Sequence, residues 1–188
     1  MKEQSKRKQQ AKHLRGFRKV HRSTGALLFI FFFVVSISGL TLGWKKHSAG
    51  LILPDTQEGT SNKVNEWLPL DSLSFLASAY LDQHTDGTLS TEIDRIDVRQ
   101  SKGVLKYTFK GHHQEVQVDG ATGEVLAIGI RYSDFVEAIH DGSYIDELLG
   151  TNGWFKLFYT SVMGIALLVF TITGFWLWYG PKRMRANQ

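Results

Sequence analysis

Two uncharged hydrophobic stretches constrain this chain more than any other feature of its sequence. Residues 25–44 and 157–179 are 20 and 23 residues long and contain no Asp, Glu, Lys or Arg. A helix rises about 1.5 Å per residue, so about 20 apolar residues are enough to cross a hydrocarbon core of about 30 Å. Trp and Tyr side chains lie at the ends of these stretches, as is typical of membrane interfaces. The sequence therefore predicts a membrane protein with two transmembrane helices.

The distribution of charge predicts how the chain crosses the membrane. The first 24 residues contain nine Lys or Arg and one acidic residue. The residues after Tyr179 contain three Lys or Arg and no acidic residue. Residues 45–156 contain ten Lys or Arg against seventeen Asp or Glu. Basic residues beside membrane spans stay in the cytoplasm, so we expect both termini inside and the acidic middle outside. The net charge of +4 then reflects membrane topology, and we expect the lipid bilayer, not nucleic acid, as the partner of the basic segments.

The first hydrophobic stretch is longer than the core of a signal peptide, which predicts an uncleaved anchor in a bacterial inner membrane. The chain contains no cysteine, which excludes disulfides and thiolate chemistry. No internal repeat is apparent. We expect this order along the chain: a basic cytoplasmic N-terminus (1–17), a first transmembrane helix (18–46), a linker (47–66), an extracytoplasmic domain (67–130), an amphipathic juxtamembrane segment (131–153), a second transmembrane helix (154–180) and a basic cytoplasmic tail (181–188).

The middle of the chain has the pattern of a small α+β domain. Leu70, Leu73, Ala77 and Leu81 recur at helical spacing, with Asp71 or Ser72 as the expected cap. Alternating apolar residues then predict strands near 93–98, 104–109, 115–118 and 124–128, joined by short turns. Short connections favour antiparallel neighbours. The expected fold class is thus an α+β membrane protein in which two transmembrane helices flank a helix laid on three or four antiparallel strands.

Four motifs, in order, resemble the family of PepSY-associated transmembrane proteins. Residues 118–126 read V-D-G-A-T-G-E-V-L, similar to the closing hairpin of PepSY domains. Residues 20–25, 139–142 and 172–178 read V-H-R-S-T-G, I-H-D-G and I-T-G-F-W-L-W, similar to the family's membrane motifs. The larger, usually four-helix relatives include inner-membrane reductases of ferric siderophores, which hold b-type haem through histidines at helix ends. Since this chain has only two spans, the resemblance implies a homodimer or a partner membrane subunit.

Three histidines are the candidate ligands of haem b. His21 lies at the cytoplasmic end of the first span, and Gly25, one turn later, would leave room for a macrocycle. His140 and His47 lie outside, near the second and first spans. His21 and His47 are 26 residues apart, or up to about 39 Å, so they cannot share one haem. The alternatives are an interfacial His21 that meets lipid headgroups and a His140 on the surface of an amphipathic helix.

Two further classes of function stay open besides haem-linked reduction of a ferric siderophore for iron acquisition. One is a non-enzymatic regulatory or binding module whose PepSY-like domain contacts a secreted protease or envelope protein, and the other is an assembly subunit of a membrane complex. No hydrolase motif or phosphate-binding loop is present. Small residues predict where the spans meet each other or a second copy: Ser36, Gly39 and Gly43 in the first span, and Ser161, Gly164, Thr171 and Gly174 in the second.

Overall fold

The computed structural model describes residues 2–186, with side chains for residues 8–185. These residues form two compact units, each described by itself. The helical unit contains the chain up to Gly39 and from Ala138 onward, and the sheet unit is Leu40–Glu137. The predicted basic N-terminus starts at Met1 and the predicted tail ends at Gln188, so the outermost residues of both lie outside the described part of the chain.

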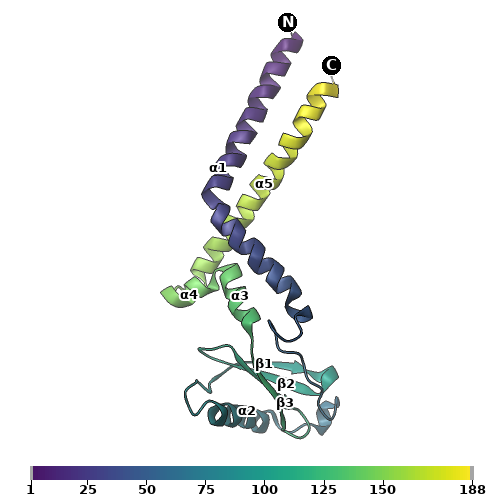
Figure 1. The fold of residues 1–188 in the computed structure, drawn as a ribbon, viewed down its shortest axis with the longest axis vertical. Helices are drawn as coiled ribbons and strands as arrows, with labels where there is room; N and C mark the ends of the chain where they lie inside the picture. The colour runs from purple at the N-terminus through teal and green to yellow at the C-terminus, as the bar shows by residue number, and fades with distance from the viewer. Residues whose placement is uncertain (1, 187–188) are drawn as a thin grey trace. The chain divides into compact units, whose positions relative to one another are not determined.

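Two long helices dominate the helical unit. α1 (Lys2–Trp44) and α5 (Trp154–Ala186) lie side by side, with the start of α1 and the end of α5 at the same end of the pair (Figure 1). Lys8–His47 and Trp154–Arg185 are long and apolar enough to cross a membrane. In the most apolar 18-residue segment of each helix, only 6% and 17% of the residues are buried. The side chains of these helices therefore present a large apolar surface that lipid can cover. Both helices therefore fit the two membrane spans that the sequence predicts.

Both long helices extend further than the sequence suggested. α1 begins at Lys2, whereas we expected the first transmembrane helix to begin at residue 18. The polar residues before Leu14 are mostly good helix formers and include no Gly or Pro, so the helix continues through them. α5 continues past Gly180 and Pro181, where we expected it to end. Gly180 is buried, and a Cβ there would lie 2.5 Å from Cδ2 of Leu14. Packing against α1 thus holds this last part of α5 in place, and membrane helices tolerate proline.

The sheet unit contains four antiparallel strands in the order β1-β2-β3-β4. The strands are β1 (Ile93–Arg99), β2 (Val104–Phe109), β3 (Gln114–Asp119) and β4 (Val125–Ile130). Each predicted strand is therefore confirmed within a few residues. The short 3-10 helix η3 (Gln100–Lys102) joins β1 to β2, and Gly103 follows it with φ +70°. Connections this short favour antiparallel pairing of consecutive strands.

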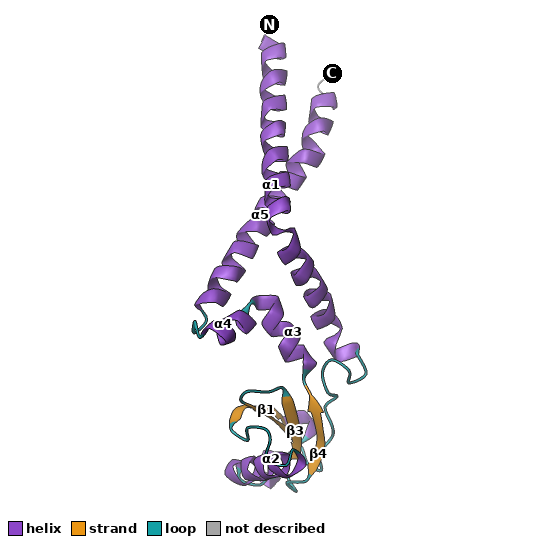
Figure 2. Ribbon diagram, turned by 60° about the vertical axis from the view of Figure 1, so that its left-hand side comes forward, coloured by secondary structure: helices purple, strands orange, loops and turns teal. Residues whose placement is uncertain are grey.

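Helix α2 (Leu70–His84) lies against one face of this sheet (Figure 2). Leu73, Ala77 and Leu81 are buried, which confirms the predicted helix face, whereas Leu70 is 53% exposed. The expected cap is wrong: the helix starts after Pro69, with no side-chain cap bond. The buried sheet residues that pack with α2 are Leu105, Tyr107, Phe109, Val116 and Val118.

The other face of the sheet is polar and is covered by the segment that we expected to be a linker. The backbone N–H of Gln57 donates to Oε1 of Gln117 (2.9 Å), whose Nε2 donates to the carbonyl of Asp55 (2.9 Å). The N–H of Thr60 donates to Oδ2 of Asp119 (2.7 Å). Residues 55–60 are therefore part of the folded domain. The buried polar side chains of this face are Lys106, Thr108, Glu115, Gln117 and Asp119.

The short helices α3 (Tyr132–Asp141) and α4 (Ser143–Leu149) precede α5. They occupy the stretch predicted as an amphipathic juxtamembrane segment, and they are separated by Gly142, whose φ of +82° suits glycine. This break lets the chain turn between the two helices. It places His140 in the last turn of α3.

Candidate functional site

His21 is held in α1 by residues of α5. Its Nδ1 lies 2.8 Å from Oγ1 of Thr173, a residue that is only 4% exposed. The ring of Phe170, one turn earlier on α5, packs edge-on against the imidazole with 4.4 Å between centroids. A Cβ on Gly174 would lie 3.8 Å from Cε1 of His21, in ordinary contact. The imidazole is therefore half-buried between the two long helices and does not extend freely toward headgroups.

Gly25 leaves room for an aromatic side chain. A Cβ at this position would lie 3.1 Å from Cζ of Phe170, tighter than most real contacts. Phe170 also packs edge-on against Phe32, with 5.1 Å between ring centroids. The space that we expected beside Gly25 for a macrocycle thus holds the Phe170 ring. A flat cofactor at His21 would have to approach another side of the imidazole.

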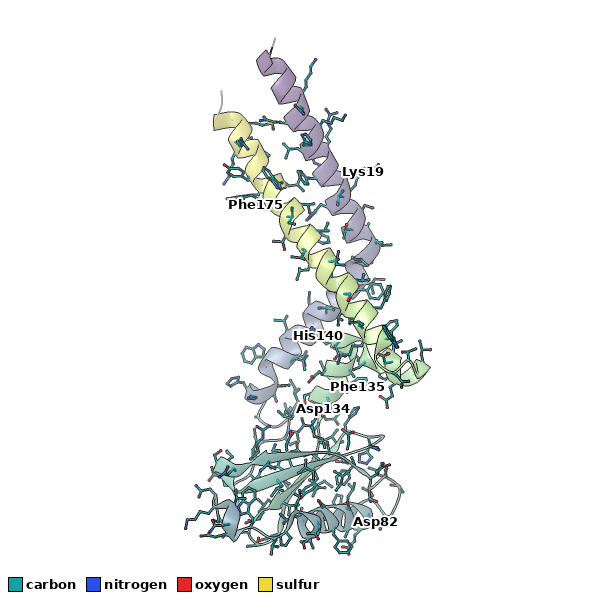
Figure 3. The ribbon with its side chains drawn as sticks, turned by 180° about the vertical axis from the view of Figure 1, so that it is seen from behind. Lys19, Asp82, Asp134, Phe135, His140 and Phe175 are labelled. Carbon is teal, nitrogen blue, oxygen red and sulfur yellow. The ribbon has the colours of Figure 1, made fainter. Side chains whose placement is uncertain are left out.

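His140, in the last turn of α3, contacts a hydroxyl of a long helix as His21 does (Figure 3). Its Nδ1 lies 2.8 Å from Oγ of Ser38 in α1, and Ser38 is 6% exposed. A Cβ on Gly39 would lie 3.4 Å from Cε1 of His140. The imidazole therefore packs on a Ser-Gly pair of α1, and a side chain larger than alanine at residue 39 would displace it.

The hydroxyl partners of both histidines also bond to backbone carbonyls of their own helices. Oγ1 of Thr173 donates to the carbonyl of Val169 (2.6 Å), and Oγ of Ser38 donates to the carbonyl of Val34 (2.7 Å). A hydroxyl has one hydrogen, so when that hydrogen goes to the helix carbonyl, its oxygen accepts from Nδ1–H of the imidazole. In that arrangement Nε2 is the ring nitrogen left to meet a ligand. Metal-bound histidines are commonly oriented by such a bond from the second ring nitrogen.

The two histidine contacts repeat one short motif. Residues 37–39 read I-S-G and residues 172–174 read I-T-G, and in each the hydroxyl holds an imidazole while the glycine packs beside it. His21 and the Ser38 partner of His140 are 17 residues apart on α1, or roughly 25 Å along the helix. The two imidazoles therefore lie at different depths.

Ionic and capping contacts fix α3 and α4 on the start of α5. Lys156 of α5 forms an ion pair with Asp141, the neighbour of His140. The carboxylate of Asp146 accepts hydrogen bonds from the backbone N–H groups of Gly153, Phe155 and Lys156. Burial disfavours this charge, but those bonds and one from a threonine hydroxyl outweigh burial and hold the pKa of Asp146 below its ordinary range. These contacts locate His140 relative to α5.

His47 differs from the other two candidates. It is exposed at the end of the short helix η1 (Lys45–His47), in the sheet unit, and belongs to neither hydroxyl–imidazole pair. Within residues 2–186 there is no group of three or more His, Cys, Asp or Glu side chains that could hold a metal ion.

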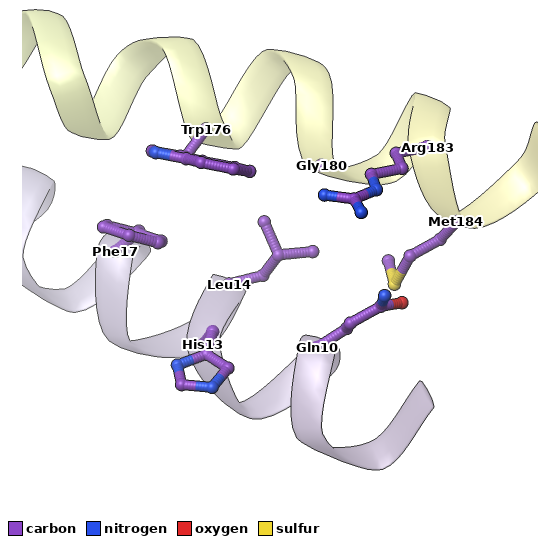
Figure 4. A pocket seen from close by; sticks show the side chains of 8 residues that line it. All are labelled: Gln10, His13, Leu14, Phe17, Trp176, Gly180, Arg183 and Met184. Carbon is purple, nitrogen blue, oxygen red and sulfur yellow. The ribbon is translucent and has the colours of Figure 1, made fainter. Parts of the chain in front are cut away.

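A small apolar cleft lies between the start of α1 and the end of α5 (Figure 4). Its volume is about 260 Å³, and Phe17 and Trp176 stack beside it with 6.0 Å between centroids. The small residues of the spans were expected to meet the other span or a second copy, and only the first of these contacts can be read within one chain. A Cβ on Gly164 would meet nothing within 4 Å, whereas Gly25 and Gly180 face close neighbours. Gly174 is a contact, as predicted.

The comparisons with known proteins agree with the motifs of the sequence. The family model described as "PepSY-associated TM region" matches residues 18–187, nearly the whole chain. No curated protein and no solved structure matches the chain. The family match thus supports a membrane protein of this type and leaves the role of its histidines to be argued from their geometry.

Proposed function

The chain belongs to the PepSY-associated transmembrane family, and on that premise we propose that it binds b-type haem and passes electrons outward across a bacterial inner membrane to a ferric siderophore. Both termini would be cytoplasmic, because the basic residues flank the outer ends of the two spans. Haem, when bound, would supply one-electron chemistry.

The observation that carries this proposal is the contact that Nδ1 of His21 and of His140 makes with a hydroxyl. Each Nδ1 lies 2.8 Å from the hydroxyl oxygen of a buried Thr173 or Ser38, and Nε2 makes no hydrogen bond with any residue that the structure describes. Both imidazoles are half-buried, so Nε2 can meet a ligand without breaking a hydrogen bond to any described residue. Two imidazoles with an uncommitted Nε2, at two depths, would each supply one axial ligand to one of two b-type haems.

One protomer supplies one imidazole at each depth. Bis-histidine ligation therefore requires a second imidazole from elsewhere, which supports the expected homodimer or partner subunit. Two copies would provide four helices, the number needed to enclose a cofactor in a bundle. His47 is exposed and is the weaker candidate for the outer site.

The test is the absorption spectrum of the full chain, purified in detergent from haem-supplied cells. We expect a Soret band and the α and β bands of six-coordinate b-type haem. His21→Ala and His140→Ala should each remove part of the haem, and the double variant should be colourless. His84→Ala is the matched control, because His84 is exposed on α2. A wild-type protein without haem, or a double variant that keeps the wild-type spectrum, would disprove the proposal.

The hydroxyls offer a sharper test. Thr173→Val removes the acceptor of the Nδ1–H bond, whereas Thr173→Ser keeps it. If Thr173 orients the ligand, valine should lower haem affinity by about 10- to 100-fold or shift the midpoint potential, and serine should restore the wild-type value. If the valine and serine variants have the same haem affinity and midpoint potential, Thr173 does not orient the ligand.

A second candidate function is a binding module, and the outer side of α2 favours it. Phe75 is 73% exposed, and Leu76 and Tyr80 are each 37% exposed. Exposed apolar side chains of this size often mark contact surfaces. A photo-crosslinker at residue 75 that joins the chain to one secreted protease or envelope protein, in a preparation free of haem, would support this candidate over electron transfer.

A further inference from the structure

A polar cleft of about 560 Å³ opens on the sheet unit, beside the polar face of the sheet. All the residues that line it belong to the Leu40–Glu137 unit. Segment 53–56 forms one wall, and η3 and the end of β1 contribute to another. Five cations line it, against Asp55 as the single carboxylate among the described lining residues: Lys46, Arg99, Lys102, Lys106 and Arg131.

Two of these cations are buried and fixed in position. Lys106 is 3% exposed and its Nζ donates to Oε1 of Glu115 (3.1 Å), which has no exposed surface. Arg131 is 9% exposed, donates through Nη1 to the other oxygen of Glu115, and donates through Nε to Asp134 (2.8 Å). These bonds use one of the three donors of Lys106 and two of the five of Arg131. The cleft therefore has a base of two paired cations that are fixed in position and still have donors left for a ligand.

The other three cations supply the surplus charge. The two carboxylates Glu115 and Asp134 balance Lys106 and Arg131, so the base is close to neutral. Lys46 forms no ion pair with any residue that the structure describes. Lys102 donates to the carbonyl of Thr56 (3.1 Å) and meets Glu58 at 3.7 Å, and that glutamate side chain is 80% exposed. Arg99 meets Asp97 at 3.8 Å. Such surface pairs are weak and rearrange readily, so an incoming anion can compete for these cations.

From this arrangement we propose that the cleft binds a small, multiply charged carboxylate. A buried base with fixed donors and a mobile cationic rim suit an anion with several carboxylates, because one carboxylate can dock on Lys106 and Arg131 while the others meet the rim. Identifying this ligand as the carboxylate shell of a ferric chelate rests on the proposed function. Binding of the anion itself does not.

Anionic lipid headgroups present the same oxyanion chemistry, and the experiment separates the two sources. We suggest calorimetric titration of the full chain with citrate and with gallium citrate, a redox-inert substitute for the ferric complex. The protein is embedded in nanodiscs of zwitterionic lipid and, in a parallel arm, of anionic lipid. Because no electron transfer is involved, a failure here is distinct from a failure to bind haem.

The rim variant carries Lys46→Gln, Arg99→Gln and Lys102→Gln, which remove charge from partly exposed side chains without disturbing the buried base. We expect saturable binding in zwitterionic nanodiscs, weakened roughly tenfold in the rim variant and weakened by salt. The matched control Lys110→Gln removes an exposed lysine that does not line the cleft, and it should bind as the wild type does.

Three results would overturn the proposal. The first is no binding at millimolar citrate, and the second is equal affinity of the rim variant and the wild type. The third concerns the two lipids: the wild type loses citrate binding when anionic lipid replaces zwitterionic lipid, but the rim variant does not. Lipid headgroups would then be the ligands of the cleft. Lys106→Met tests the base separately: it should abolish binding while the thermal unfolding of the protein stays cooperative.

Discussion

Asp119 gives the sharpest test of how the sheet unit is held together. This residue ends β3, is 2% exposed, and its carboxylate joins the covering segment to the hairpin turn. Oδ2 accepts from the N–H (2.7 Å) and the hydroxyl of Thr60, and Oδ1 accepts from the N–H of Ala121 (2.8 Å). We predict that Asp119→Asn destabilises the unit although the side chain keeps its shape.

The size of the effect follows from these bonds. An asparagine can keep the bond to Ala121, but its amide then faces the N–H of Thr60, donor against donor. Hydrogen bonds to charged groups contribute about 1.5–3 kcal/mol, and an unpaired buried donor costs about 1–3 kcal/mol. We therefore expect a loss of about 2–3 kcal/mol in the free energy of unfolding of this unit, a large part of the stability of a domain of this size.

Hydrogen–deuterium exchange of the full chain measures this loss locally. A destabilisation of about 2–3 kcal/mol should speed exchange of the β3–β4 amides roughly 30- to 150-fold at pH 7. Thr60→Val is the control that removes only the hydroxyl bond, and it should cause a smaller change. An Asp119→Asn protein whose exchange rises less than about threefold would refute the reasoning.

Acid should mimic the substitution. Burial opposes the charge of Asp119 most strongly, but the bonds from Thr60, Ala121 and Thr122 together hold its pKa below the ordinary range. A depressed folded pKa contributes stability that is fully present above the unfolded pKa of about 3.9 and is lost as the pH falls through the folded value. The gap in stability between wild type and Asp119→Asn should therefore narrow below about pH 4. A gap that stays constant from pH 7 to pH 3 would contradict this account.

Two further substitutions can be read by the same exchange measurement. Leu81→Ala opens a cavity between α2 and the sheet, where Leu81 has no exposed surface, and should cost about 2–5 kcal/mol; a loss below about 1 kcal/mol would show that the site collapses around alanine. Gly123→Ala forces a side chain onto a φ of +75° and places its Cβ 2.6 Å from Cδ1 of Leu76, so it should cost at least about 1–2 kcal/mol, and unchanged exchange in the β3–β4 turn would refute this.

The sequence allowed the sheet unit to be predicted well because its signals are local. Alternation predicted the four strands, and the apolar face of α2 predicted the core around Leu73 and Leu81. The role of residues 55–60 was missed, since their bonds to Gln117 and Asp119 join positions about 60 residues apart. A polar strand face looks solvent-exposed in the sequence, and only the fold reveals that a distant segment buries it.

The helical unit was predicted less completely. Hydropathy identified the two spans, and the histidines were singled out by their position near the span ends. The hydroxyl partners of those histidines, Ser38 and Thr173, were missed, because small residues in a span were read only as packing surface. The repeated I-S-G and I-T-G tripeptides were the available signal. Comparing the two spans with each other would have found them.

The repeated contacts also limit how two copies could combine. His21 and His140 contact α1 or α5 at depths roughly 25 Å apart, so a pairing that joins His21 of one copy to His140 of another would require the copies to be shifted or inverted. Inversion would place a basic terminus on the wrong side of the membrane. A twofold axis parallel to the helices instead brings each histidine to its own counterpart at equal depth. Of the possible assemblies, a parallel symmetric dimer is therefore the one that satisfies both the charge distribution and the geometry of the two imidazoles.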